Sequence, residues 1–203
     1  MSLPLPRADG LPAGLRARKK LKTRLAIQEH ALRLFRDQGY HETTVEQIAE
    51  AAEVSPSTFF RYFPTKEDVV LFDPLDPILV ESFRRQPAEL SPLGAMRAAF
   101  HEIFGALSPE RIQEQRERGL LVYSVPELQA AWIGDVLRTA RMMTDMLAER
   151  LGRPADDERV RLYSGAFMGV ALAAMAPILE DQDADYVGAL DAALDFLEGG
   201  LQL

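Results

Sequence analysis

The segment from Thr43 to Phe63, TTVEQIAEAAEVSPSTFFRYF, contains the start signals of two short helices separated by a tight turn. Thr43 and Glu46 stand in the S/T-x-x-E relation of a capping box, which predicts a helix start. An apolar stripe with helical spacing follows them, formed by Val45, Ile48, Ala49 and Ala52. The first half of the segment therefore predicts an amphipathic helix that must bury one face against another element.

Ser55 and Pro56 predict the start of a second helix, since Ser is a good N-cap and Pro fits the first helical position. Phe59 and Phe63 lie four residues apart and are expected to face the core. The opposite face is small, polar and basic, which suits a groove of DNA. The residues expected to approach base edges or the adjoining sugars are Ser55, Pro56, Ser57, Thr58, Phe60 and Arg61.

Glu53 lies between the two predicted helices, at a position where a turn of this kind favours Gly. A left-handed backbone there costs a non-Gly residue roughly 1–2 kcal/mol, which we expect the fold to tolerate. An ordinary helical hairpin within a bundle is the alternative interpretation of this segment. The two caps, the spacing and the polar face favour a helix-turn-helix.

From about Thr23 to Val70 the chain resembles the DNA-binding domain of the tetracycline-repressor (TetR) family of bacterial transcriptional regulators. The residues that carry the resemblance are Ala31 to Phe35, Gly39-Tyr40, Thr43 to Val45, Ile48-Ala49, Val54-Ser55, Thr58, Phe60 to Phe63 and Lys66-Glu67. The resemblance implies an all-α protein. Its expected parts are a flexible basic leader at 1–19, a three-helix DNA-binding domain at 20–72, and a helical effector-binding and dimerisation domain at 73–203.

The net charge of −8 is unevenly distributed along the chain. Residues 1–64 carry 10 Lys and Arg against 7 Asp and Glu, whereas residues 65–203 carry 13 against 24. A basic run at 16–24, which includes Lys19 and Lys20, lies before and within the first turns of the first predicted helix. We expect this run to contact phosphates or the minor groove. Phosphate contacts are also predicted for Thr44, Tyr62 and Lys66.

Several classes of site and location are disfavoured by the composition. The chain has no cysteine and only three scattered histidines, so we expect no metal site and no cofactor. No set of residues typical of a catalytic centre is present, and we expect no enzymatic activity. The run without charge from Ser164 to Leu179 is shorter than the ~20 residues that span a bilayer and contains Pro177. The N-terminus lacks the apolar core of a signal peptide, so a cytoplasmic location without membrane attachment is expected.

Pro74 and Pro77 are expected to kink or interrupt the fourth helix, which opens at Thr65 with Asp68 three residues later. We place the domain boundary at this point. No segment alternates with period two, so no sheet is expected. The helices predicted beyond the boundary lie at about 78–86, 92–107, 109–122, 126–151, 157–179 and 184–200.

The last two predicted helices carry apolar stripes with three- and four-residue spacing. In the TetR family these helices pair with their two-fold mates, so the resemblance implies a homodimer. The predicted interface residues are Phe167, Val170, Ala174, Leu190, Leu194 and Leu197. Aromatic and Met residues of the middle helices suit an adaptable apolar pocket. The predicted ligand contacts are Phe100, Phe104, Trp132, Met142 and Phe167.

These observations favour a dimeric repressor that leaves a palindromic operator in double-stranded DNA when a small hydrophobic or amphipathic effector binds. Three alternatives stay open at this point: an activator of the same fold, a helical small-molecule-binding protein without operator recognition, and a helical-bundle enzyme. The basic run, Tyr62 and Lys66 disfavour the binding protein. The absence of a catalytic constellation disfavours the enzyme.

Overall fold

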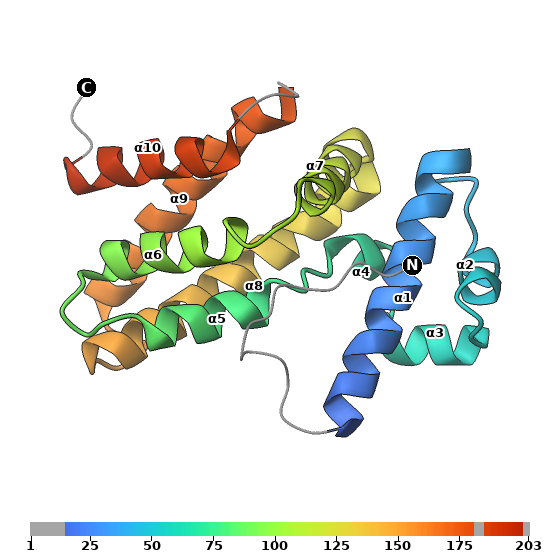
Figure 1. Cartoon of the computed structure of the whole chain (residues 1–203), viewed down its shortest axis with the longest axis horizontal. Helices are drawn as coiled ribbons and strands as arrows, with labels where there is room; N and C mark the ends of the chain where they lie inside the picture. Colours follow the sequence, from blue (N-terminus) through green and yellow to red (C-terminus); the bar gives the residue numbers. More distant parts are fainter. Residues whose placement is uncertain (1–14, 181–184, 201–203) are drawn as a thin grey trace. The chain divides into compact units, whose positions relative to one another are not determined.

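The computed structural model describes residues 15–180 and 185–200, and in this part of the chain it contains ten α-helices and no strand (Figure 1). The predicted all-α class is confirmed. The helices are α1 (Leu15–Gln38), α2 (Val45–Ala51), α3 (Pro56–Tyr62), α4 (Lys66–Leu71), α5 (Asp76–Arg85), α6 (Pro92–Phe104), α7 (Pro109–Ser124), α8 (Pro126–Leu151), α9 (Glu158–Glu180) and α10 (Tyr186–Glu198).

The described residues form two compact units. Unit 1 contains residues 15–74 and 117–133, and unit 2 contains 75–116 and 134–200. The division after Pro74 lies two residues from the predicted boundary. The segment 117–133 differs from the prediction, because Val122, Val125 and Leu128 are buried in the core of unit 1. Helices α7 and α8 therefore have residues in both units.

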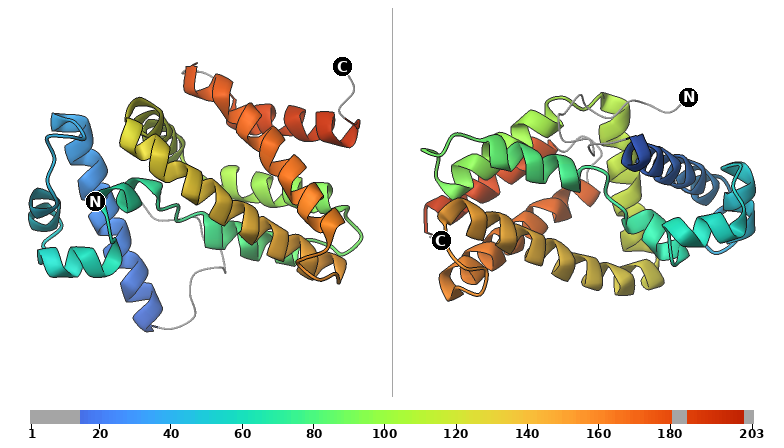
Figure 2. Two further views of the ribbon diagram at one scale, coloured as in Figure 1. Left: turned by 180° about the vertical axis from the view of Figure 1, so that it is seen from behind. Right: turned by 90° about the horizontal axis from the view of Figure 1, so that it is seen from below.

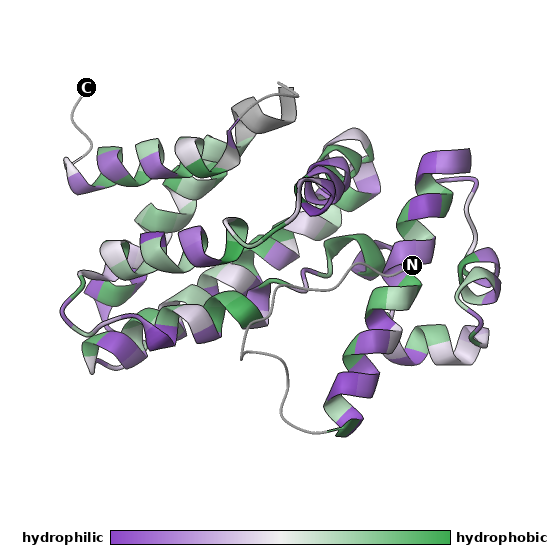
Figure 3. Ribbon diagram, viewed as in Figure 1, coloured by the Kyte–Doolittle hydropathy of each residue, from purple (hydrophilic) through white to green (hydrophobic). Residues whose placement is uncertain are grey.

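In unit 1, α1 buries Ile27, Ala31 and Phe35 in the core. Gly39 ends the helix with φ +92°, a left-handed conformation that glycine adopts without steric cost. Because α1 begins at Leu15, residues 15–19 are helical, which corrects the predicted extent of the leader; residues 1–14 lie outside the described residues. Figure 3 shows hydrophilic residues along much of α1.

The fourth helix starts with the predicted cap. The Thr65 side chain accepts from the Asp68 backbone N–H, and the Asp68 carboxylate accepts from the Thr65 backbone N–H. Helix α4 ends at Leu71, and α5 is a separate helix with Pro77 in its first turn. Pro74 therefore lies between two separate helices and Pro77 in the first turn of the second, and neither kinks a continuous helix.

Unit 2 has its own core, to which α5, α6, α9, α10 and the second half of α8 contribute. Helices α9 and α10 pack against each other (Figure 2), and α10 also packs on α6. Three residues predicted to form the dimer interface lie inside this core: Phe167, Leu190 and Leu194 are 2%, 6% and 0% exposed. That part of the prediction is wrong, because the stripes of α9 and α10 pack within the protomer.

Candidate nucleic-acid interface

The start of α2 lies one residue later than the sequence pattern predicted. Thr44 is the N-cap, its side chain accepts from the Gln47 N–H, and the Gln47 side chain accepts from the Thr44 N–H at 2.9 Å. Thr43 is buried instead, and its hydroxyl donates to the Gly39 carbonyl at 2.8 Å. The capping box is therefore Thr44 with Gln47, and the assignment to Thr43 and Glu46 is wrong. Thr44 remains exposed at the N-terminus of α2, as a phosphate contact requires.

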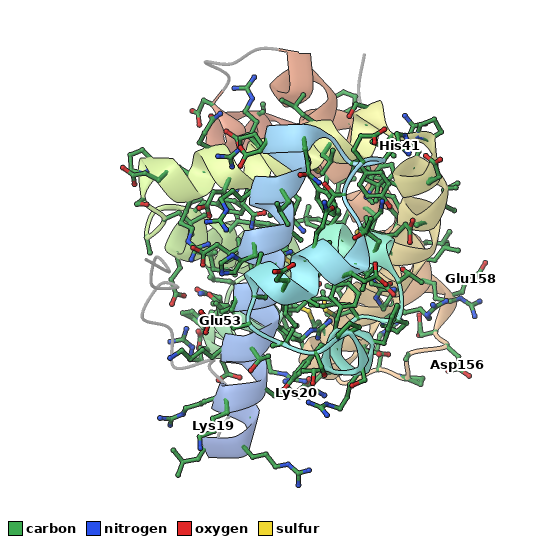
Figure 4. All side chains as sticks on the ribbon, turned by 90° about the vertical axis from the view of Figure 1, so that its right-hand side faces the viewer. Lys19, Lys20, His41, Glu53, Asp156 and Glu158 are labelled. Carbon is green, nitrogen blue, oxygen red and sulfur yellow. The ribbon has the colours of Figure 1, made fainter. Side chains whose placement is uncertain are left out.

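Glu53 lies in the turn between α2 and α3 with a φ of 53°. Among the residues that the structure describes, it is the only one other than glycine with a positive φ. Val54 N–H donates to the Ala49 carbonyl at 2.9 Å, which fixes the entry of the chain into α3. Ile48 and Ala49 are 0% and 1% exposed beneath this turn. The predicted left-handed backbone is confirmed, and Figure 4 shows Glu53 on the loop that leads into α3.

Glu53→Gly should stabilise the protein by about 0.5–1 kcal/mol. The substitution removes the steric cost of the left-handed residue, and the extra chain entropy of glycine in the unfolded state offsets part of the gain. Urea unfolding measures the difference. The matched control is Glu50→Gly within α2, where the backbone is helical and the expected change is a loss of about 1 kcal/mol. Equal losses of unfolding free energy in the two variants would contradict backbone strain at Glu53.

Helix α3 begins as predicted, with Ser55 as N-cap and Pro56 at the first helical position. The Ser55 hydroxyl oxygen accepts from the Thr58 N–H at 3.1 Å and lies 2.9 Å from the Ser57 hydroxyl oxygen. On the other face Phe59 and Phe63 are fully buried. The helix therefore has a fixed start and a fixed rotation about its axis, as a recognition helix needs.

The residues predicted to approach bases lie on the outer face of α3. Ser55, Pro56, Ser57, Phe60 and Arg61 are exposed, and Thr58 and Tyr62 are partly exposed. Phe60 is apolar and yet 50% exposed, with its ring edge-on to Phe59. The Arg61 guanidinium lies 3.5 Å from the Thr58 hydroxyl oxygen and 5.5 Å from the centroid of the Tyr62 ring. Arg61 is thus the single cation on a face of small polar and aromatic side chains.

The basic run of α1 divides into two groups. Lys19 and Lys20 are exposed and project from the N-terminal turns of the helix, as Figure 4 shows. Arg24 instead lies over the rings of Phe63 and Phe72, 4.8 and 3.9 Å from their centroids. Burial lowers the pKa of Arg24, against the opposing effect of the Asp68 charge. Lys19 and Lys20 are therefore available to phosphates, while Arg24 packs on the end of α3.

Lys66, predicted to bind phosphate, forms contacts within unit 1. Its ammonium donates to the backbone carbonyls of Tyr40 at 2.8 Å and Thr43 at 3.1 Å, and it lies 4.0 Å from the centroid of the Tyr40 ring. The Tyr40 hydroxyl in turn donates to Glu67 Oε1 at 2.6 Å. The first turn of α4 therefore holds the segment between α1 and α2. The sequence pattern did not indicate this role for Tyr40, Lys66 or Glu67.

The Tyr40–Glu67 hydrogen bond should make the stability of the protein depend on pH at both extremes. Burial raises the pKa of Tyr40, and the Glu67 carboxylate raises it further. Burial opposes ionisation of Glu67, but the hydrogen bond from Tyr40, its own backbone N–H and Thr65 together lower its pKa. The contribution of Glu67 is complete above the ordinary Glu pKa of about 4.3 and is lost as pH falls through the lowered value. The contribution of Tyr40 is lost as pH rises above about 10.

Tyr40→Phe should therefore flatten the decline in unfolding free energy on both sides of neutral pH. Urea titrations at about pH 4, 7 and 11 measure the decline. Tyr123→Phe, which removes an exposed hydroxyl in the same unit, is the control and should keep the profile of the parent. Identical profiles for Tyr40→Phe and the parent would contradict the coupling.

The structure gathers four of the five predicted ligand residues in unit 2. The Phe100 ring is stacked on Phe104 and on Phe167, with centroids 5.8 and 6.3 Å apart. Met142 packs against the same core. Trp132 belongs to unit 1, where it packs against the core and its ring lies 6.1 Å from that of Tyr123. Trp132 therefore belongs to a different unit from the other four, because the first two turns of α8 are part of unit 1.

Other kinds of site find no support in the part of the chain that the structure describes. No group of three or more His, Cys, Asp and Glu residues is arranged to hold a metal ion there. None of the helices, over the residues described, combines the length and hydropathy needed to cross a membrane.

Comparison with known proteins identifies the family. A family model described as "Bacterial regulatory proteins, tetR family" matches residues 27–71, and another, "MftR C-terminal domain", matches residues 90–202. The HTH-type transcriptional regulator TcmR of Streptomyces glaucescens is 36% identical over 170 residues, which are 77% of this chain and 73% of TcmR. The chain belongs to the TetR family. It is accordingly a DNA-binding transcriptional regulator, and α2 and α3 are its helix-turn-helix.

Two further TetR-family proteins are similar over nearly the whole chain. The putative mycofactocin biosynthesis regulator MftR of Mycobacterium tuberculosis is 27% identical over 195 residues, which are 91% of this chain and 93% of MftR. The crystal structure of Thermus thermophilus FadR, a TetR-family repressor in complex with lauroyl-CoA, superimposes with a TM-score of 0.58 at 24% identity. The superposition covers 89% of this chain and 95% of FadR, which shows a shared fold.

Proposed function

We propose that this TetR-family regulator is a dimeric repressor that binds a palindromic operator and releases it when a small effector binds unit 2. The observation that carries the proposal is the outer face of α3, where Arg61 stands among exposed small polar residues on a helix fixed by Ser55 and Phe59. Lys19 and Lys20 supply charge for phosphates on the same unit. The protein acts on chromosomal DNA in the cytoplasm and has no enzymatic step of its own.

The dimer interface is proposed on the outer faces of α9 and α10. Leu162 is 65% exposed on α9, and Gly165 and Gly169 lie on the exposed side with no atom near the place of a Cβ. On α10, Phe196 is 41% exposed. Apolar and small residues on exposed helix faces are typical of a helix-to-helix interface between subunits. Val170, Ala174 and Leu197, which are only partly buried in the protomer, remain interface candidates.

The effector is proposed to be apolar or amphipathic. The stacked rings of Phe100, Phe104 and Phe167, with Met142, form an aromatic and Met-containing region without a charged member. Such surfaces adapt to apolar ligands. FadR, which shares the fold, binds lauroyl-CoA, a ligand with a long apolar chain. The exposed recognition helix disfavours the alternative of a binding protein that does not recognise DNA.

Selection of bound duplexes from a random pool tests the proposed function. The parent should enrich a two-fold symmetric sequence whose half-sites lie about 34–36 Å apart or a small multiple of that distance, since each protomer inserts one α3 into the major groove. Addition of effector candidates such as acyl-CoA thioesters then tests release, with an expected loss of affinity of roughly 5–150-fold. A pool that stays unenriched would refute operator recognition.

A further inference from the structure

The C-terminal end of α4 is held by two side chains from other helices of unit 1. Gln28 of α1, which is 6% exposed, donates from Nε2 to the carbonyls of Val69 at 2.9 Å and Phe72 at 2.6 Å. Arg118 of α7 donates from Nη1 to the carbonyls of Val70 at 3.3 Å and Phe72 at 3.1 Å. The last carbonyls of a helix have no partner within the helix, so these two side chains supply the missing donors.

Arg118 also forms an ion pair next to these carbonyls. Its Nη2 donates to Asp73 Oδ2 at 2.6 Å, and the two side chains are only 16% and 29% exposed. A partly buried charge that contacts both a carboxylate and backbone carbonyls is held more firmly than an exposed pair. A cation is also favoured at the C-terminal end of a helix. Arg118 therefore fixes the second half of α7 to the end of α4.

The opposite end of α4 contacts the segment that leads into the helix-turn-helix. Lys66 donates to the carbonyls of Tyr40 and Thr43, and Glu67 accepts from the Tyr40 hydroxyl. Thr44, the next residue, caps α2. Helix α4 has six residues, and Val69, Val70 and Leu71 are buried in the core of unit 1. It is thus a short rigid element with α7 at one end and the start of α2 at the other.

We infer that Arg118 is a positioning residue for operator binding. It connects α7 with α4, so a displacement of α7 relative to α1 changes the position of α4 and, through Lys66 and Tyr40, that of α2 and α3. Helix α7 has residues in both units, which makes it suitable for this connection. The inference rests on the proposed function, because it specifies which residue regulates the placement of the recognition helix.

The test compares four variants in the full-length protein with the operator selected by the parent. Arg118→Met removes the donors and the charge but keeps an unbranched apolar chain. Arg118→Lys keeps the charge. Arg36→Met breaks the exposed pair of Arg36 with Glu117, 2.7 Å apart, which also joins α1 to α7. Val122→Ala lowers stability through the buried face of α7 without touching Arg118.

At a temperature where circular dichroism shows each variant folded, Arg118→Met should weaken operator binding by roughly 5–150-fold. Arg118→Lys should recover part of the loss. Arg36→Met should change affinity by no more than about twofold, since exposed ion pairs contribute little. Val122→Ala should change it by a similarly small factor even where its melting temperature is lower. An Arg118→Met variant that binds the operator as tightly as Val122→Ala does would overturn the inference.

Hydrogen exchange gives the second readout, which a purely structural role would not change. In the parent, saturating operator should slow exchange of backbone amides in α4 and in the second half of α7. In Arg118→Met, saturating operator should still slow exchange in α4 but no longer in α7. Equal slowing of α7 in both proteins overturns the inference, whatever the affinities. A parent that selects no operator refutes the proposed function, and the role of Arg118 with it.

Discussion

Leu194→Glu should yield protein that does not fold, whereas Leu162→Glu should yield folded monomers. Leu194 is 0% exposed in the core of unit 2, and Leu162 is 65% exposed on α9. A buried Leu→Ala change already costs about 2–5 kcal/mol, and an unpaired carboxylate at the same place costs more. On the outer face of α9 the same carboxylate stays in water in the monomer, and at the proposed interface it would be buried only when two subunits meet.

Circular dichroism and sedimentation of the two variants measure these outcomes. Leu162→Glu should melt as a folded monomer. It should also lose operator affinity, because one recognition helix then binds one half-site alone. Leu162→Ser, which adds no charge, is the matched control and should remain partly dimeric. A Leu162→Glu protein that sediments as a dimer would place the interface elsewhere. A folded Leu194→Glu protein would contradict the burial of Leu194 in the core of unit 2.

Arg61→Ala should relax sequence preference and weaken operator binding by roughly 1–3 kcal/mol, the range for a bidentate contact between arginine and a base. Arg61 is the cation of the outer face of α3, and it is exposed. Lys20→Ala is the matched control, because Lys20 is exposed on α1 and is expected to contact phosphate.

Titrations of the operator and of unrelated DNA at several salt concentrations separate the two effects. Lys20→Ala should weaken binding to all sequences about equally and reduce the slope of log K against log salt by about one unit. Arg61→Ala should lower the ratio of operator affinity to affinity for unrelated DNA. An unchanged ratio for Arg61→Ala would remove Arg61 from the base contacts.

The local features of the helix-turn-helix could be predicted because short-range chemistry determines them. Ser55 with Pro56 starts α3, Thr65 with Asp68 starts α4, and Glu53 takes the left-handed conformation of the turn. The sequence pattern places the cap of α2 one residue too early, since Thr43 with Glu46 fits it as well as Thr44 with Gln47. Only the hydrogen bonds of Thr43 with Gly39 and Gln38 decide between them.

The roles that depend on tertiary contacts could not be predicted in the same way. A helical apolar stripe shows that a face is buried but not whether its partner lies in the same protomer. The stripe of α10 alone therefore fits a dimer interface as well as the core in which Leu190 and Leu194 lie. A basic residue near the N-terminus suggests phosphate, yet Arg24 stacks on Phe72. Arg118 lies in a mixed-charge run without any motif, and its partners Val70 and Asp73 are more than 40 residues away.

We propose that two copies of α3 bind two symmetric half-sites of one operator. This claim is tested most directly by titrating the protein against the selected duplex and against the same duplex with one half-site scrambled. One intact duplex should bind two protomers, one at each half-site. Scrambling one half-site should reduce the affinity steeply, toward the non-specific level that is typically ~10³–10⁷-fold weaker. Equal affinity for the intact and the scrambled duplex would contradict the claim.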